Sequence, residues 1–298
     1  MDSSWTRLLT DWEIPPAITV ILILTGLVYA SGWRKTHNTR PTELPSWRLT
    51  IFCLGLFSLF VAVASPLDTF GESLIFMHMG QHFVLMSVAP PLIVLGSPSV
   101  PILRGLPRPI VRWVIRPLVR AALPRRLLRF SMRPFVAWLS MNLAYLGWHI
   151  PRAYEFALKS EFWHNLEHLC FLVTSILFWW VVIAPWPYRR PIISTWVLVP
   201  YLLVADIVNT GLSAFLCFSG RLLYPSYGKT PRPFGIDALK DQVAAGAFMW
   251  VFGSVVFLAA VTRIVVRLSS GETMQLRGST TWGRLHTLAR TTSTRTTP

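Results

Sequence analysis

The segment from Phe76 to Pro91 reads Phe-Met-His-Met-Gly-Gln-His-Phe-Val-Leu-Met-Ser-Val-Ala-Pro-Pro, and it lies within an apolar run from Ser73 to Leu95. That run is long enough to cross a bilayer as a helix. His78 and His82 are four residues apart and therefore share one helix face. Polar side chains are costly at this depth and usually functional. The same stripe also carries an amide and a thioether, Gln81 and Met86. The pattern favours a metal or haem site, or else two histidines that each bond a neighbouring helix.

The composition is typical of a polytopic membrane protein. Of 298 residues, 53% are hydrophobic and 14% are charged, which is too apolar for a soluble domain of this size. The net charge of +15 would suggest nucleic acid for a soluble protein, but basic residues also collect in cytoplasmic loops. We therefore expect no nucleic-acid partner. The three cysteines form no C-x-x-C pair, which argues against a thiol redox motif.

The chain contains seven apolar runs of about spanning length, so the expected fold is an all-α bundle of seven transmembrane helices. We expect the first run to be a spanning helix, not a signal peptide, because it lacks a small-residue cleavage site. The runs are Pro16 to Ser31, Trp47 to Ser65, Ser73 to Leu95, Pro134 to Ile150, Trp163 to Ala184, Ser194 to Phe218 and Asp241 to Val266.

The distribution of Lys and Arg predicts the orientation of this bundle. One set of alternate connections, together with the C-terminal end, carries 20 of these residues, whereas the other set and the N-terminal segment carry 7. Basic residues are retained on the cytoplasmic side. We therefore expect the N-terminus outside and the C-terminus in the cytoplasm.

Two cytoplasmic segments are expected outside the helices. Residues 97–133 carry arginines at every fourth position from Arg104 to Arg120, interleaved with apolar residues. This predicts a short interfacial helix, interrupted by prolines, that lies against anionic lipid at the cytoplasmic face; a docking surface for loops of a partner is the alternative. The domain prediction is a membrane domain over 1–268 and a disordered tail over 269–298, which is rich in Ser, Thr and Arg.

With this orientation, five of the seven histidines fall in the outer half of the membrane. His78 and His82 lie roughly 8 and 14 Å below the outer end of their helix, at 1.5 Å per residue. The fourth helix ends at the outer rim and the fifth begins there. Their histidines are His149, His164 and His168, and neighbouring polar or soft groups that could support a site are Glu167, Asp206, Asp241, Gln81, Met86 and Met249.

Imidazoles at i and i+4 on two helices, with carboxylates to orient them and thioethers nearby, suit copper, zinc or iron. Copper is favoured among these ions because methionine and cysteine supply soft ligands. Three other interpretations remain open. In the first, a network of Asp and His side chains holds the bundle together and has no other role. In the second, His78 or His82 binds a b-type haem together with His168, as in an electron carrier. In the third, His164-Asn165-Leu166-Glu167-His168 is the H-x-x-E-H motif of an intramembrane zinc hydrolase.

Several dispersed motifs resemble the CtaG-type family of cytochrome c oxidase assembly factors, over about residues 65–256. They are His78-Met79-Gly80-Gln81-His82 with Ala89-Pro90-Pro91-Leu92 and Leu95-Gly96-Ser97-Pro98, Trp148-His149-Ile150-Pro151 with His164 and Glu167-His168, and Asp241-Gln242 with Ala245-Gly246 and Met249-Trp250.

The resemblance implies a multi-span protein of the bacterial cytoplasmic membrane that helps a copper-containing oxidase to mature. It implies copper delivery to oxidase subunits, or stabilisation of an unfinished oxidase, and no turnover reaction. Oxidase copper centres lie toward the outer side of the membrane, which is the half to which the five histidines map.

Overall fold

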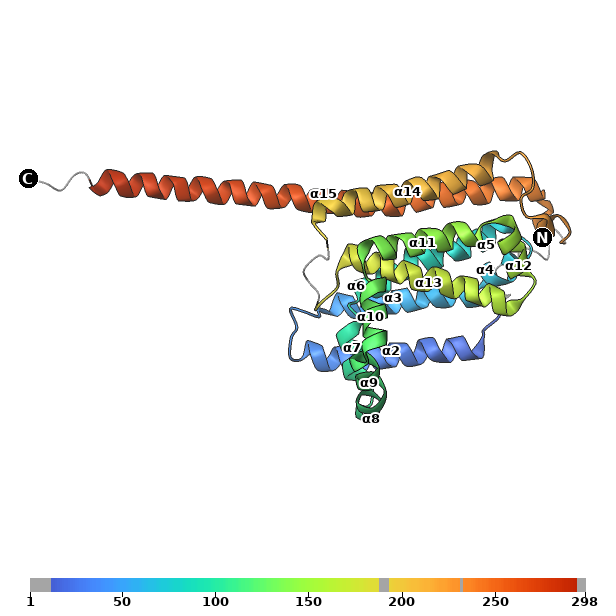
Figure 1. The fold of residues 1–298 in the computed structure, drawn as a ribbon, viewed down its shortest axis with the longest axis horizontal. Coiled ribbons are helices and arrows are strands. Elements are labelled where there is room, and N and C mark those ends of the chain that lie inside the picture. The colour runs from blue at the N-terminus through green and yellow to red at the C-terminus, as the bar shows by residue number, and fades with distance from the viewer. Residues whose placement is uncertain (1–11, 188–192, 231–232, 294–298) are drawn as a thin grey trace, which may run out of the picture.

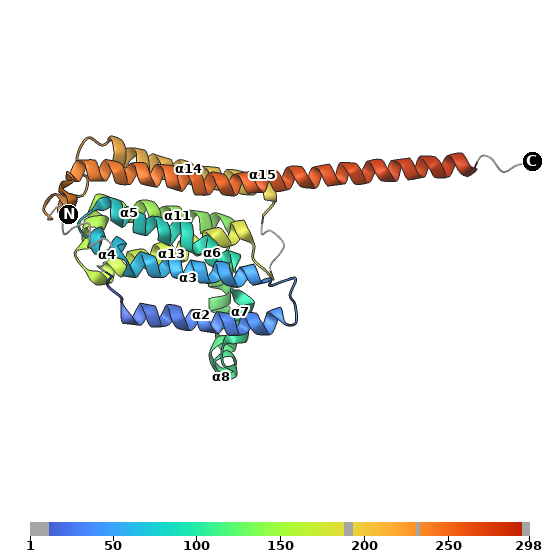
Figure 2. The ribbon, with the colours of Figure 1, turned by 180° about the vertical axis from the view of Figure 1, so that it is seen from behind.

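The computed structural model describes residues 12–187, 193–230 and 233–293, and side chains as far as Ser270. The elements within these residues are helices, so the predicted all-α class is confirmed. They form a bundle whose long helices lie side by side (Figures 1 and 2).

Six helices are long and apolar enough to cross a membrane. They are α2 (Pro16–His37), α3 (Ser46–Ala64), the continuous helix Ile75–Leu95, α13 (Glu161–Ile183), α14 (Thr195–Phe218) and the first part, Ala238–Ser270, of α15 (Ala238–Ser293). Their outward faces are apolar, as a surface in contact with lipid must be. The described chain is therefore a multi-pass helical membrane protein.

The fourth predicted span forms a shorter helix than the sequence suggested. Helix α11 covers Pro134–Trp148, which is 15 residues or roughly 22 Å at 1.5 Å per residue, whereas about 20 residues cross a bilayer. It still runs within the bundle beside α13 and α14 (Figure 1). Helix α11 ends early because Pro151 starts a separate helix, α12 (Pro151–Leu158), and a proline disfavours helical geometry in the residue before it.

Short elements gather at one end of the bundle, next to the start of α2. These are α4 (Pro66–Gly71), α12 and the 3-10 turns η3 (Pro225–Gly228) and η4 (Pro233–Gly235). Helix α15 leaves the bundle at the opposite end (Figures 1 and 2). The start of α2 and the exit of α15 therefore lie at opposite ends of the bundle.

The helix that carries His78 and His82 is not a regular α-helix throughout. It consists of α5 (Ile75–Phe83), a π-helical segment η1 (Val84–Val88) and α6 (Ala89–Leu95). Pro90 and Pro91 have no backbone N–H, so they leave carbonyls of the preceding turn without a helical donor. The indole of Trp179 donates to one of these, the carbonyl of Met86, at 3.1 Å. The proline pair thus accounts for the π segment, and such segments are frequent at functional sites.

The basic segment forms an arm of short helices across the direction of the bundle (Figure 1). In order these are α7 (Ser99–Gly105), α8 (Arg108–Ile110), the π segment η2 (Val111–Ile115), α9 (Arg116–Arg120) and α10 (Ala122–Ser131). Helix α7 packs closely on α2 through Gly32 and Gly105, where an added Cβ would lie within 2 Å of a carbonyl oxygen of the other helix. The prolines thus interrupt the arm, as the sequence predicted.

Helix α15 continues to Ser293, through most of the segment for which the sequence predicted disorder. Extending an existing helix costs less than starting one, and residues 272–293 contain no proline to stop it. Beyond Ser270 the structure describes the backbone of this helix and not its side chains. The division into a membrane domain and a tail stays a prediction.

Candidate metal centre

The bundle brings all five predicted histidines together. Ring centroids are 4.3 Å apart for His78 and His82, 5.4 Å for His82 and His168, and 4.2 Å for His164 and His168. His149 lies 5.6 Å from His82. Helices α5 and α13 supply four of the rings because their i, i+4 pairs face one another, and the end of α11 supplies the fifth.

Two overlapping groups of side chains have ligand atoms within 4.8 Å of one another: His78, His82 and His168, and His78, His164 and Glu167. Five buried atoms of this cluster accept or donate no hydrogen bond: Nδ1 of His82, Nε2 of His164, Nε2 of His168 and both carboxylate oxygens of Glu167. The closest approach of Glu167 is Oε1 to Nε2 of His82, at 3.7 Å. Buried polar atoms are normally paired, so this concentration indicates a site for a ligand that these groups would share.

A hydrogen-bond chain from the loop after α14 orients His78. The hydroxyl of Tyr227 donates to the carbonyl of Gly71 at 2.8 Å and lies 3.2 Å from Nδ1 of His78. Burial holds the pKa of the Tyr227 phenol well above its ordinary value, so this group stays protonated. Its single proton points at Gly71, and Nδ1 of His78 must then be the donor. The lone pair of Nε2 therefore faces His82, whose Nε2 is 2.8 Å away.

The fifth histidine, His149, is held by backbone and sulfur atoms. Its Nδ1 lies 2.7 Å from the carbonyl of Tyr145 and its Nε2 lies 3.3 Å from the sulfur of Met79. A neutral imidazole can donate from only one nitrogen, and the carbonyl takes that proton because it can only accept. The Nε2 lone pair is then next to the thioether, and the two groups form a second pair of donor atoms beside His82.

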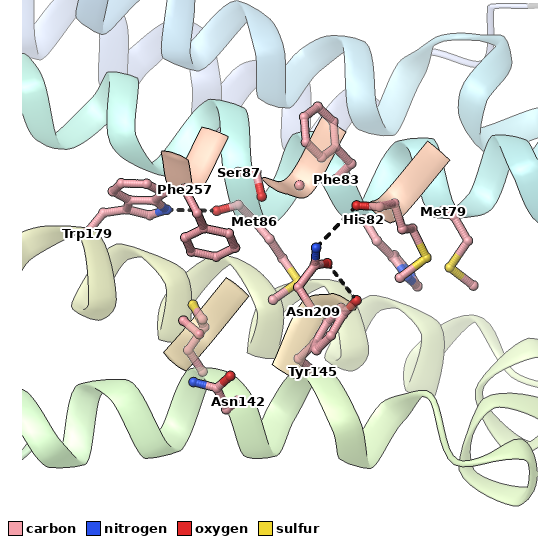
Figure 3. Close-up of a pocket in the computed structure, with 14 residues that line it drawn as sticks. Met79, His82, Phe83, Met86, Ser87, Asn142, Tyr145, Trp179, Asn209 and Phe257 are labelled. Atoms are coloured by element: carbon pink, nitrogen blue, oxygen red, sulfur yellow. Dashed lines mark hydrogen bonds between the residues drawn. The ribbon is translucent and has the colours of Figure 1, made fainter. Parts of the chain in front are cut away.

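A cavity of about 40 Å³ adjoins the histidines (Figure 3). It has room for about three or four waters, each of which needs roughly 10–15 Å³. Four methionines and His82 lie on its wall, together with Asn209, which accepts from Tyr145 at 3.0 Å and donates to the carbonyl of Met249 at 3.3 Å. The methionines are Met79, Met86, Met141 and Met249. Thioethers thus line the space next to the imidazoles.

Two of the predicted supporting residues act on the helix that carries His78 and His82, without reaching the cluster. Asp241 accepts from the backbone N–H groups of Ile75 and Phe76, at 2.8 and 3.1 Å, and so caps the start of α5 from helix α15. Gln81 donates to the carbonyl of Ala62 and to Asp68, at 2.9 and 2.6 Å. Asp241 therefore holds α5 by its backbone, and Gln81 holds it by its side chain, through Ala62 and Asp68.

Asp206 does not point into the cluster. It accepts from the hydroxyl of Ser254 at 2.7 Å, between α14 and α15. Cys217, also on α14, donates to the carbonyl of Val243 on α15 at 3.5 Å. These two polar side chains therefore join α14 to α15, as polar side chains often do between transmembrane helices.

Sequence reasoning missed the tyrosines that cover the cluster. Tyr154 and Tyr227 share a hydrogen bond of 2.9 Å, and Tyr224 stacks on Tyr154 and donates to the carbonyl of His149 at 3.1 Å. Glu155 on α12 fixes the loop by accepting from the backbone N–H and the hydroxyl of Ser226. Residues 224–227 lie in a loop without hydrophobic periodicity, so no pattern marked them as buried.

Fold and site together define a class: a multi-pass helical membrane protein with a buried histidine and carboxylate cluster toward one end of its bundle. The chain belongs to the family described as cytochrome c oxidase caa3 assembly factor, Caa3_CtaG, whose sequence profile matches residues 27–270. The resemblance found in the motifs is thus confirmed.

Curated relatives are uncharacterized proteins of mycobacteria. One from Mycobacterium leprae is 26% identical over 203 residues, which make up 63% of this chain and 29% of that protein. One from Mycobacterium bovis is 26% identical over 198 residues, or 62% of this chain and 28% of that protein. The chain thus matches less than a third of the length of these relatives. No solved structure matches it.

Proposed function

We propose that this chain assists the assembly of a copper-containing cytochrome c oxidase by holding copper at the histidine cluster. The observation that carries the proposal is the set of five buried, unpaired donor atoms on His82, His164, His168 and Glu167. A cation that shares these lone pairs would remove the cost of leaving them unpaired. The family description supports the oxidase as client, and oxidase subunits as partners.

The choice of copper rests on the donors beside the imidazoles. Soft thioethers select Cu(I), whereas zinc sites are built from imidazole, thiolate and carboxylate. Met79 lies against His149, and Met86 and Met249 line the cavity next to His82. Copper is cargo in this proposal: His78, His82 and His168 would hold it, and His149 with the thioethers would offer further ligands during exchange.

The packing favours an ion over a haem. The haem interpretation pairs His168 with His78 or His82, and it requires open space for the macrocycle beside these rings. The adjoining cavity, at about 40 Å³, has room for a few waters and not for a porphyrin.

The zinc-hydrolase alternative needs His164 and His168 as joint ligands and Glu167 as general base. In the described residues these two histidines fall into different ligand groups, and Glu167 is itself grouped with His78 and His164. A carboxylate that shares a ligand group with two imidazoles is better placed to bind or orient the metal than to activate a water beyond it. The geometry therefore supports a metal-holding role for Glu167.

We further propose that α11 completes a seven-span bundle with the N-terminus outside. The start of α2 and the exit of α15 lie at opposite ends, which an odd number of crossings requires (Figure 1). The histidine cluster then lies toward the outer side, where oxidase copper centres are found. The arm would lie on the anionic cytoplasmic leaflet, since α10 exposes Leu123, Leu127 and Phe130 among arginines.

The test is complementation in a strain that lacks the gene. The double variant His78→Ala/His82→Ala should lower oxidase activity and oxidase copper content together while the chain stays at normal abundance. His37→Gln, at a histidine outside the cluster, is the matched control and should behave as wild type. Excess copper should partly restore the double variant by mass action. Normal copper content in an oxidase made with the double variant would contradict the proposal.

Glu167→Gln separates the remaining cases. It should weaken copper loading only in part, because an amide oxygen still orients an imidazole, whereas it would abolish a hydrolase. Complete loss of oxidase activity with oxidase copper content intact would exclude the copper role.

A further inference from the structure

A second, larger cavity lies at the opposite end of the bundle from the histidines. Its volume is about 480 Å³, and its wall is formed by the start of α3, the end of α6, the end of α13 with the turn after it, and α15. Three of the lining residues are arginines, Arg48, Arg263 and Arg267, and none of the described lining residues is acidic. Arg263 and Arg267 are four residues apart on α15 and therefore share a face.

Arg48, the arginine on α3, is held in place by hydrogen bonds within the cavity wall. Arg48 donates to the hydroxyl of Ser97, and the same hydroxyl accepts from the backbone N–H of Trp186 at 3.2 Å. Tyr29 donates to the carbonyl of Gly96 at 2.6 Å, and its ring stacks on Phe52. Four segments thus fix the position of the Arg48 guanidinium before any ligand arrives, which lowers the ordering cost of binding.

The remaining lining of this cavity is apolar. Leu95, Val182, Ile183 and Ala259 contribute to the wall between the arginines and the middle of the bundle. Guanidinium groups bind the oxygens of phosphate in a bidentate manner. A ligand that matches both the arginines and the apolar lining carries a phosphate at one end and hydrocarbon at the other.

The positive charge of the three arginines argues against this cavity as an entry path for copper ions. Trp179 lines both this cavity and the methionine-lined cavity, so its indole separates the two. Three positive charges around the larger cavity repel a metal cation, and Coulomb repulsion is strengthened where the surroundings are apolar. The larger cavity is therefore suited to an anion.

We propose that this cavity is a binding site for one anionic phospholipid, with the phosphate held by Arg48, Arg263 and Arg267 and an acyl chain along the apolar wall. The site is independent of the copper proposal and of the arm. Basic pockets between transmembrane helices on the cytoplasmic side are suited to such headgroups.

The experiment is native mass spectrometry of the full chain in detergent, titrated with phosphatidylglycerol, phosphatidylcholine or inorganic phosphate. We expect one phosphatidylglycerol adduct at concentrations where phosphatidylcholine gives none. Arg263→Gln/Arg267→Gln should weaken it at least about tenfold, since each charge-assisted hydrogen bond contributes roughly a decade in affinity. Arg112→Gln/Arg116→Gln, which removes the same charge from the arm, should leave it unchanged.

A second variant tests the cavity without altering its charge. Ala259→Trp should fill the space beside the arginines and also remove the adduct, with the melting temperature as the check on folding. Equal binding of both lipids, or wild-type binding by both the arginine variant and Ala259→Trp, would overturn the proposal. Displacement of the lipid by inorganic phosphate would identify free phosphate as the ligand and would overturn the lipid assignment.

Discussion

The substitution Asp241→Asn tests how helix α15 positions the histidine helix. Asp241 is buried and accepts from two backbone N–H groups at the start of α5, at 2.8 and 3.1 Å. A hydrogen bond to a charged group contributes about 1.5–3 kcal/mol. Asparagine keeps one acceptor oxygen but turns its NH₂ group toward the second N–H, so we expect a loss of about 2 kcal/mol.

The assay is thermal unfolding in detergent, followed by tryptophan fluorescence, with copper titration of the same sample. A loss of about 2 kcal/mol lowers the melting temperature by about 4–8 °C in a chain of this size. Because His78 lies only one turn into α5, a displaced helix start should also weaken copper affinity by roughly tenfold, as loss of outer-shell support does.

Asp206→Asn is the matched control, since it removes the same charge from the adjoining pair of helices. Asp206 accepts a hydrogen bond from the hydroxyl of Ser254 at 2.7 Å, and asparagine can still accept it. We expect a change of about 1 kcal/mol or less and unaltered copper affinity. If Asp241→Asn melts and binds copper as Asp206→Asn does, the capping argument is refuted.

Two further substitutions test close packing and the orientation of the site. Gly32→Ala would place a Cβ 1.7 Å from a carbonyl oxygen of α7, so α2 and α7 must separate and the free energy of unfolding should fall by about 1–3 kcal/mol, measured by thermal unfolding. Gly26→Ala, whose Cβ would make only a 3.5 Å contact, should leave it unchanged. Equal melting temperatures for the two variants would contradict the close contact. Tyr227→Phe removes the hydroxyl beside Nδ1 of His78 and should weaken copper affinity about tenfold in the same titration. Tyr224→Phe is the control and should have little effect. An unaltered copper affinity for Tyr227→Phe would show that the hydroxyl does not orient the imidazole.

Local signals were sufficient for the predictions that held. Apolar runs predicted the helix class, and most ends were placed within two or three residues, as with Thr195–Phe218 for the run from Ser194. The i, i+4 spacing of His78 with His82 and of His164 with His168 predicted two faces with imidazoles, and helix direction placed them at one depth. Dispersed motifs predicted the family, which the match over residues 27–270 confirmed.

The sequence could not predict the role of a residue where a neighbouring helix decides it. Asp206 and Asp241 are both expected to support the histidines; in the structure Asp206 accepts from Ser254 and Asp241 caps α5. Helical periodicity places a side chain on a face, yet it does not say which helix packs against that face. The π segment had a local cause in Pro90 and Pro91, but its carbonyl is satisfied by Trp179, 93 residues away.

The sequence was sufficient to predict that this chain crosses the membrane repeatedly, that four of its histidines lie on two helix faces, and which family it belongs to. These properties depend on hydropathy, spacing and motifs, all of which are local. The packing of helices was needed to show that Tyr227 orients His78, that methionines from different helices line one cavity, and that Arg48, Arg263 and Arg267 line another. Each of these arises between segments far apart in the chain, because a buried polar group is satisfied by whichever neighbour packing brings to it.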